Sequence, residues 1–274
     1  MKKRIVSLLL ALAVLCTGVM LTACGAKDNA PETVAQKSVA DVINEALKKT
    51  GDLDSMSAEM KMVMDMETEG MTMSIPITAK IKTKDFKSDN MVMSMAMTMS
   101  MFGQDIVIEM YQEGQWAYVV MGDVKYKANV KDMEGEFDYA DSAKDMLKEI
   151  PEDLLKDVEL VKAEDGSQSV TVSFPAEKFT EIYTGLIQDV NSETGTETEE
   201  MKISDAIVTI TMANDYVTVC DIAFTMDMTV EGVSSTTKAK TTLTYENPGQ
   251  PVTITPPEGY QDFEEVDMDD SMFE

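Results

Sequence analysis

Residues 91–101 read Met-Val-Met-Ser-Met-Ala-Met-Thr-Met-Ser-Met. Methionine occupies every second position, and mostly small or polar residues fill the positions between. Because successive side chains of a β-strand point to opposite faces, this alternation predicts one strand with all its thioethers on one face. The methionines are Met91, Met93, Met95, Met97, Met99 and Met101. At about 3.3 Å per residue the strand would be roughly 36 Å long, which is unusual for a globular sheet.

The same two-residue period continues on both sides of this segment. Methionine alternates with other residues over 60–66, and a turn at Glu69-Gly70 separates that strand from the next. Further alternating strands are predicted over 116–130, 202–229 and 236–246. The apolar positions of the alternating segments include Met60, Met62, Met64, Met66, Ile106, Ile108, Trp116, Tyr118, Phe224 and Met226. The pattern therefore favours one continuous antiparallel sheet over two domains.

Helical periodicity occurs in three segments. Residues 39–49 carry an apolar stripe, and Ser38 and Asp41 have the spacing of a capping box at its start. Residues 175–190 carry a second apolar stripe. A weaker helical pattern runs over 143–158. We therefore expect a few helices to pack against the sheet.

The N-terminus has the layout of a secretory signal, with three basic residues before an apolar run that is shorter than a membrane span. Leu21-Thr22-Ala23-Cys24 then resembles the bacterial lipobox, in which the cysteine is acylated and becomes the mature N-terminus. The alternative is an ordinary secretory signal with an incidental cysteine. We expect residues 1–23 to be cleaved, Cys24 to carry acyl chains such as palmitate, and residues 24–37 to form a flexible tether. The protein would then lie on the extracytoplasmic face of the cell membrane.

Charge and composition exclude several classes of function. The 274 residues include 50 acidic and 23 basic side chains, a net charge of −27. Nucleic acid is an improbable partner because binding to it needs basic residues that neutralise phosphates. The absence of histidine excludes His-dependent catalytic triads and most zinc sites. The acidic end, residues 260–274, is expected to form a mobile tail.

No catalytic motif is present. A glycine-rich phosphate loop, a zinc-protease helix and a hydrolase nucleophile elbow are all missing from the sequence. We therefore predict that the protein is not an enzyme and that it needs no cofactor or metal. Cys220 would be the one free thiol after processing, buried as a small apolar residue without a disulfide partner.

The chain resembles a known superfamily in the order of its features and in its ending. A last strand is followed by Pro251-Val252-Thr253-Ile254-Thr255-Pro256-Pro257. This resembles the superfamily of LolA, LolB and the mycobacterial lipoproteins LppX and LprG, and also uncharacterised lipoproteins of Gram-positive bacteria. The resemblance implies an α+β fold in which a strongly curved antiparallel sheet wraps a few helices as a half-open β-barrel, here as a single domain over 38–259. Several members of that superfamily carry acyl chains in the cavity.

The methionines allow three interpretations. They can fill a close-packed core, or part of their face can line a cavity in which flexible thioethers adapt to a lipid or another apolar ligand. Clustered thioethers can also bind Cu(I). We take the leading function to be a monomeric envelope lipoprotein that carries an apolar ligand in a methionine-rich cavity. The alternatives are a structural or interaction lipoprotein without a ligand and, less favoured, a Cu(I)-binding protein.

Overall fold

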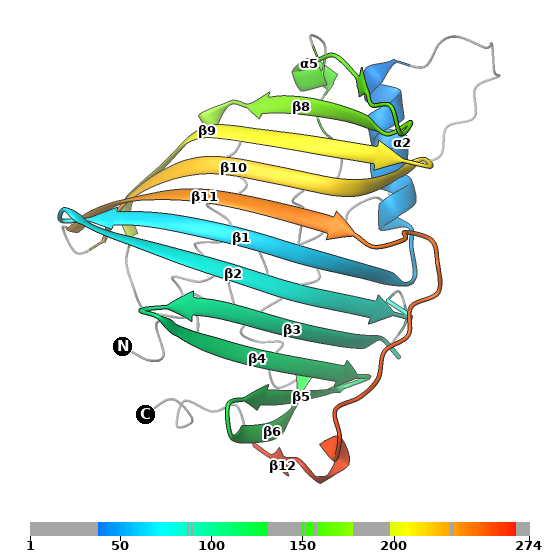
Figure 1. Cartoon of the computed structure of the whole chain (residues 1–274), viewed down its shortest axis with the longest axis vertical. Helices are drawn as coiled ribbons and strands as arrows, with labels where there is room; N and C mark the ends of the chain where they lie inside the picture. The colour runs from blue at the N-terminus through cyan, green and yellow to red at the C-terminus, as the bar shows by residue number, and fades with distance from the viewer. Residues whose placement is uncertain are drawn as a thin grey trace.

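The protein is described by a computed structural model that covers residues 38–130, 150–177 and 198–266, apart from 87, 89, 151, 156–157 and 231–232. Its strands are β1 (Met56–Thr68), β2 (Met71–Lys84), β3 (Val92–Met101), β4 (Gln104–Glu113), β5 (Trp116–Met121), β6 (Val124–Asn129), β7 (Val161–Lys162), β8 (Gln168–Phe174), β9 (Thr198–Ala213), β10 (Tyr216–Val230), β11 (Val233–Tyr245) and β12 (Glu264–Glu265). All twelve strands form one sheet in the order β12-β6-β5-β4-β3-β2-β1-β11-β10-β9-β8-β7 (Figure 1).

The sheet consists of two meanders that meet in its middle. Strands β1 to β6 lie side by side in chain order, and β7 to β11 do the same on the other side. The two meanders join where β1 pairs antiparallel with β11, from Ala58 opposite Tyr245 to Thr68 opposite Ser235. The predicted strands are confirmed, with 116–130 divided into β5 and β6 and 202–229 into β9 and β10.

The two faces of the sheet differ as the alternation predicts. Along most of β1, β2 and β11 every second residue is buried, and the residues between are mostly charged or hydroxylic. Lysines of the outer face, such as Lys61 on β1 and Lys80 on β2, are exposed. Cross-strand hydrogen bonds also occur there, as between Thr236 Oγ1 and Asp227 Oδ1 at 2.6 Å. One face is therefore solvated and the other forms the core.

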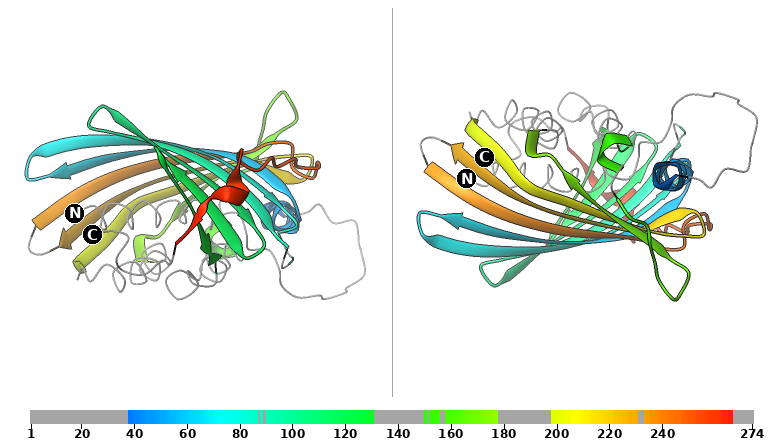
Figure 2. Two further views of the ribbon diagram at one scale, coloured as in Figure 1. Left: turned by 90° about the horizontal axis from the view of Figure 1, so that it is seen from below. Right: turned by 90° about the horizontal axis from the view of Figure 1, so that it is seen from above.

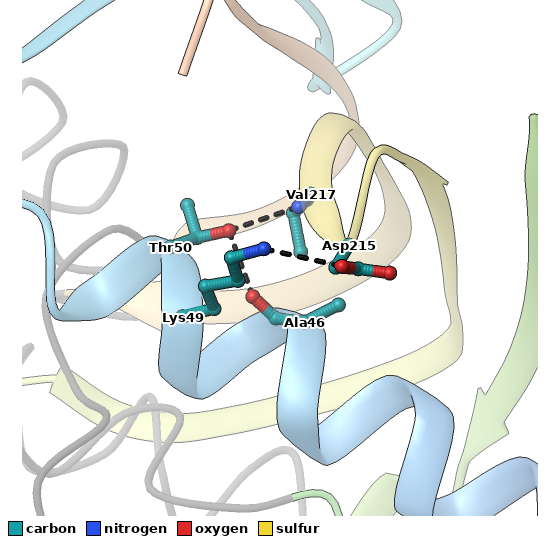
Figure 3. Close-up of polar contacts among 5 residues, drawn as sticks. All are labelled: Ala46, Lys49, Thr50, Asp215 and Val217. Atoms are coloured by element: carbon teal, nitrogen blue, oxygen red, sulfur yellow. Dashed lines mark hydrogen bonds and ion pairs between the residues drawn. The ribbon is translucent and has the colours of Figure 1, made fainter. Parts of the chain in front are cut away.

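Helix α2 (Val39–Gly51) packs on the core face near the start of β10. Its capping box is present: Asp41 N donates to Ser38 Oγ at 3.1 Å, and Ser38 N donates to Asp41 Oδ2 at 3.0 Å. At the other end, the buried Thr50 hydroxyl joins helix and sheet (Figure 3). It donates to Ala46 O at 2.8 Å and accepts from Val217 N at 2.9 Å.

The described part of the chain is mostly β, which corrects the expectation of an α+β fold with a few helices. Figure 2 shows α2 and the short α5 (Glu152–Leu155) on the same side of a curved, open sheet. Within the described ranges, α2 is the one α-helix longer than a single turn. The helix predicted over 175–190 lies outside them beyond residue 177, as do residues 131–149, the signal peptide, Cys24 and the tether.

The first part of the predicted mobile tail, residues 260–266, is ordered against the sheet. Residues Tyr260–Asp262 form a 3₁₀ turn, and β12 pairs parallel with β6 at Tyr126 and Lys127. Tyr260 and the buried Phe263 then pack against Tyr118 with ring centroids 4.9 and 6.1 Å away. The contacts of these two aromatic rings with Tyr118 hold the first part of the acidic tail against the sheet.

Candidate ligand-binding face

The core face of the sheet carries apolar side chains in rows that run across the strands. Residues directly opposite each other in paired strands share a face, so the register defines each row. One row crosses nine strands, from β8 to β5, without a polar side chain. It consists of Val170, Ile210, Cys220, Leu243, Met60, Ala79, Met97, Ile108 and Met121.

Alanines separate some of the large side chains within these rows. Ala79 separates Met60 from Met97, and in another row Ala239 separates Phe224 from Met64. The small residues leave space for the long thioethers beside them. Because methionine has three flexible torsions, it can fill such irregular space.

Burial along the main row falls steadily from the middle of the sheet toward β5. Met60 is 1% exposed, Met97 is 4% exposed, Ile108 is half-buried and Met121 is 37% exposed. The predicted residues of this face fall into two groups by burial. The buried ones are Met60, Met62, Met64, Met95, Met97, Met99 and Phe224; the half-buried ones are Met66, Met91, Met93, Met101, Ile106, Ile108 and Met226. We call the half-buried apolar part on β3, β4 and β5 the open end of the face.

Two predicted residues, Trp116 and Tyr118, do not belong to this face. Tyr118 lies opposite Tyr111, and Trp116 lies opposite Glu113. Their strand neighbour Ala117 shares the core face with Gln112 instead. Trp116 and Tyr118 therefore lie on the outer face, where Lys127 Nζ is 5.1 Å from the Trp116 ring centroid.

The outer aromatic cluster was not predicted as a unit. It consists of Tyr111, Tyr118, Tyr260 and Phe263, and its ring contacts are 4.9 to 6.1 Å between centroids. Burial, followed by the charge of Glu113, raises the pKa of Tyr111 to about 12. The three-residue spacing of Tyr260 and Phe263 in an otherwise acidic segment was the available sequence signal.

Titratable groups on the core face are few. Burial, with a smaller contribution from Asp221, raises the pKa of the Cys220 thiol to about 12. Burial also raises the pKa of Tyr245, and the neighbouring Cys220 adds to the effect. Both groups are therefore protonated at neutral pH, so in the described residues the thiol is an apolar filler rather than a nucleophile.

Two buried side-chain oxygens have no hydrogen-bond partner among the described residues. They are Thr83 Oγ1 on β2 and Asn44 Oδ1 on α2. Thr83 itself is 6% exposed and lies on the core face, between Met56 and Met93. A buried oxygen without a partner is rare in native proteins and calls for an explanation.

Two features are absent from the described ranges. No helix there is long and apolar enough to cross a membrane. Groups of three or more histidine, cysteine, aspartate or glutamate side chains with the geometry of a metal site are also absent from these ranges.

Comparison with known proteins identifies a family and two similar structures. The model of DUF6612, described as a family of unknown function, matches residues 38–261. The crystal structure of LprF from Mycobacterium bovis is 15% identical, with a TM-score of 0.40, over 80% of this chain and 96% of that one. A DUF1329 family protein from Desulfovibrio piger is 10% identical, with a TM-score of 0.24, over the same shares. No curated protein matches the sequence.

Proposed function

This chain belongs to the DUF6612 family, and we propose that it is a lipoprotein that binds or carries an apolar ligand, such as an acyl chain, at the open end of its core face. It would be anchored on the extracytoplasmic side of the membrane through Cys24. It would act by binding and not as an enzyme.

The gradient of burial along the main apolar row is the observation that supports ligand binding. A soluble protein gains about 25 cal/mol for each Å² of apolar surface removed from water. The half-buried Ile108 and the exposed Met121 continue a buried row, so an apolar ligand on them would extend the core outward. Met110, also half-buried on this face, adds a flexible thioether that can adapt to ligands of different shape.

The N-terminal sequence supports the proposed location. The Leu21-Thr22-Ala23-Cys24 motif follows a basic and then an apolar segment. One acyl chain alone gives marginal membrane binding, whereas two or more on a single cysteine hold a protein stably. The resemblance to the LolA and LppX superfamily favours a half-open barrel around the ligand.

Dye binding to two matched variants tests the ligand site. Ile108 and Val107 are neighbours on β4 that point to opposite faces, and Val107 is exposed. The neutral apolar dye N-phenylnaphthylamine should become fluorescent with the wild-type protein. Ile108→Trp should occupy the site and abolish the signal, while Val107→Trp should retain it. Equal dye binding by both variants would contradict the proposed site.

A second candidate is an envelope lipoprotein that holds no ligand and contacts another component. The near-complete burial of Met60 and Met99 favours it, because a filled core needs no ligand. Mass spectrometry of extracts from the gently purified full protein distinguishes the two: a co-purified lipid supports the carrier. Absence of lipid together with absence of dye binding supports the ligand-free protein.

The anchor is tested separately through Cys24. The wild-type protein should carry the added mass of acyl chains and fractionate with membranes. Cys24→Ala should lose that mass and appear in the medium or as the uncleaved precursor. Normal cleavage with unchanged membrane retention would disprove acylation at this residue.

A further inference from the structure

Thr83 is a polar exception on the apolar face. Four other residues of the same face of β2, which are Ile75, Ile77, Ala79 and Ile81, are all apolar and buried. Thr83 continues their alternation, yet its buried Oγ1 has no partner in the part of the chain that the structure describes. A valine would have the same shape without the hydroxyl group.

An unpartnered hydroxyl in this position is destabilising by itself. A buried donor or acceptor gives up its hydrogen bonds to water, and nothing compensates for that loss unless it gains a partner. The side-chain neighbours that the register gives Thr83 on either side, Met56 and Met93, are both methionines. Thioether sulfur is only a weak acceptor. Among the described residues, the hydroxyl therefore lacks a good partner.

Thr83 borders the open end of the face. Met93, directly opposite it on β3, is half-buried, and so is Gln112, which lies opposite Met93 on β4. Strands are about 4.8 Å apart, so Thr83 lies roughly 10 Å from Gln112 across the sheet. The Gln112 amide donates to Gly114 O at 3.4 Å. Beyond Gln112 on the same face of β4, the side chains are apolar: Met110, Ile108 and Ile106.

We propose that the Thr83 hydroxyl binds the polar end of an amphiphilic ligand, an alcohol or a carbonyl oxygen, whose hydrocarbon chain lies along β3 and β4. This inference rests on the proposed function and specifies the chemical class of the ligand. The ligand oxygen satisfies the buried hydroxyl, and the chain covers the half-buried side chains. The polar end lies at the α2 end of the sheet, because β2 ends there and β1 begins there.

Displacement of N-phenylnaphthylamine by decanol and by decane tests this orientation with the full-length protein. The two competitors have the same chain and differ by one hydroxyl group. The wild-type protein should bind decanol more tightly than decane. Thr83→Val should weaken decanol binding about tenfold, the factor that corresponds to about 1.4 kcal/mol, and leave decane binding unchanged. Thr83→Ser retains the hydroxyl and should keep the preference for decanol.

Thr241→Val provides the matched control. Thr241 is also buried on the core face, but it lies on β11, away from the open end. The Thr241→Val substitution should not change the preference for decanol over decane. Dye binding with no decanol preference in the wild-type protein, or with the same preference in Thr83→Val, would overturn the inference while the proposed function stands. Failure of the wild-type protein to bind dye would instead overturn the proposed function.

Discussion

Truncation of two methionines on one strand tests how the core face is packed. Met93 and Met99 lie on the same face of β3, but Met99 is 1% exposed and Met93 is half-buried. Met99 lies between Ile77 and Ile106 in the sheet. Met99→Ala removes three buried heavy atoms, which at about 0.8 kcal/mol each gives about 2.4 kcal/mol of lost transfer free energy. The unfilled space adds to this, so a total loss of about 2 to 5 kcal/mol is expected.

Met93→Ala should cost much less. Its side chain is already partly in contact with water, and the space it leaves is open to solvent, so the loss should be near 1 kcal/mol. Urea unfolding of both variants measures the two free energies of unfolding under the same conditions. Met71→Ala, at a position that is 70% exposed, is the control and should change little. Equal losses for Met93→Ala and Met99→Ala would refute the difference in packing between the buried core and the open end, on which the proposed ligand site depends.

Three further predictions concern single side chains. Burial in the folded protein raises the pKa of Cys220 to about 12, from its ordinary value of 9.0. Between about pH 9 and pH 12 the unfolded state therefore binds fewer protons than the folded state, so the free energy of unfolding falls as the pH rises. Cys220→Ala should make this fall smaller, as measured by the urea midpoint at each pH. Thr50→Val leaves the buried Val217 N–H without its acceptor and should lower the free energy of unfolding by about 1 to 3 kcal/mol. The same substitution at an exposed threonine should change it little. Phe263→Ala removes a ring buried against Tyr118, so limited proteolysis should cut the C-terminal segment faster; unchanged cleavage would contradict its anchoring role.

Most of the sheet could be predicted because its strands alternate so regularly. The methionines at 60–66 and 91–101 recur at every second position. This period of two is typical of a β-strand with one apolar face. The helix start at Ser38 was also predictable, because a capping box depends on local residues alone.

The face of β5 could not be predicted from its alternation. Trp116 and Tyr118 are apolar and alternate, but alternation does not say which side of the sheet they occupy. That side is fixed by the turn through Gly114 and Gln115, which places Trp116 opposite Glu113. Aromatic residues can occupy the outer side of β5 because Tyr260 and Phe263 pack against Tyr118 there. Residues so far apart in the sequence form no local pattern from which this contact could be predicted.

Nothing in the sequence indicated that the Thr83 hydroxyl would lack a partner among the described residues. Threonine is common in strands, and it usually finds a backbone or side-chain partner nearby. Whether it does so depends on the side chains that the register brings beside it. Here the register supplies methionines, which only the folded structure reveals.

The pairing of β1 with β11 has a consequence for the order in which the protein folds. Each meander can form from contacts between neighbours in sequence, but this central pairing joins residues such as Ser57 and Glu246, which are 189 positions apart. Closing so long a loop costs entropy before any contact compensates for it, and folding slows as contacts become less local. During synthesis the first meander therefore has to wait for the second, with β1 as an edge strand that is rich in methionine. Refolding from urea should show a slow phase in which the β1–β11 pairing forms last, and that interval is when the protein is most vulnerable to aggregation.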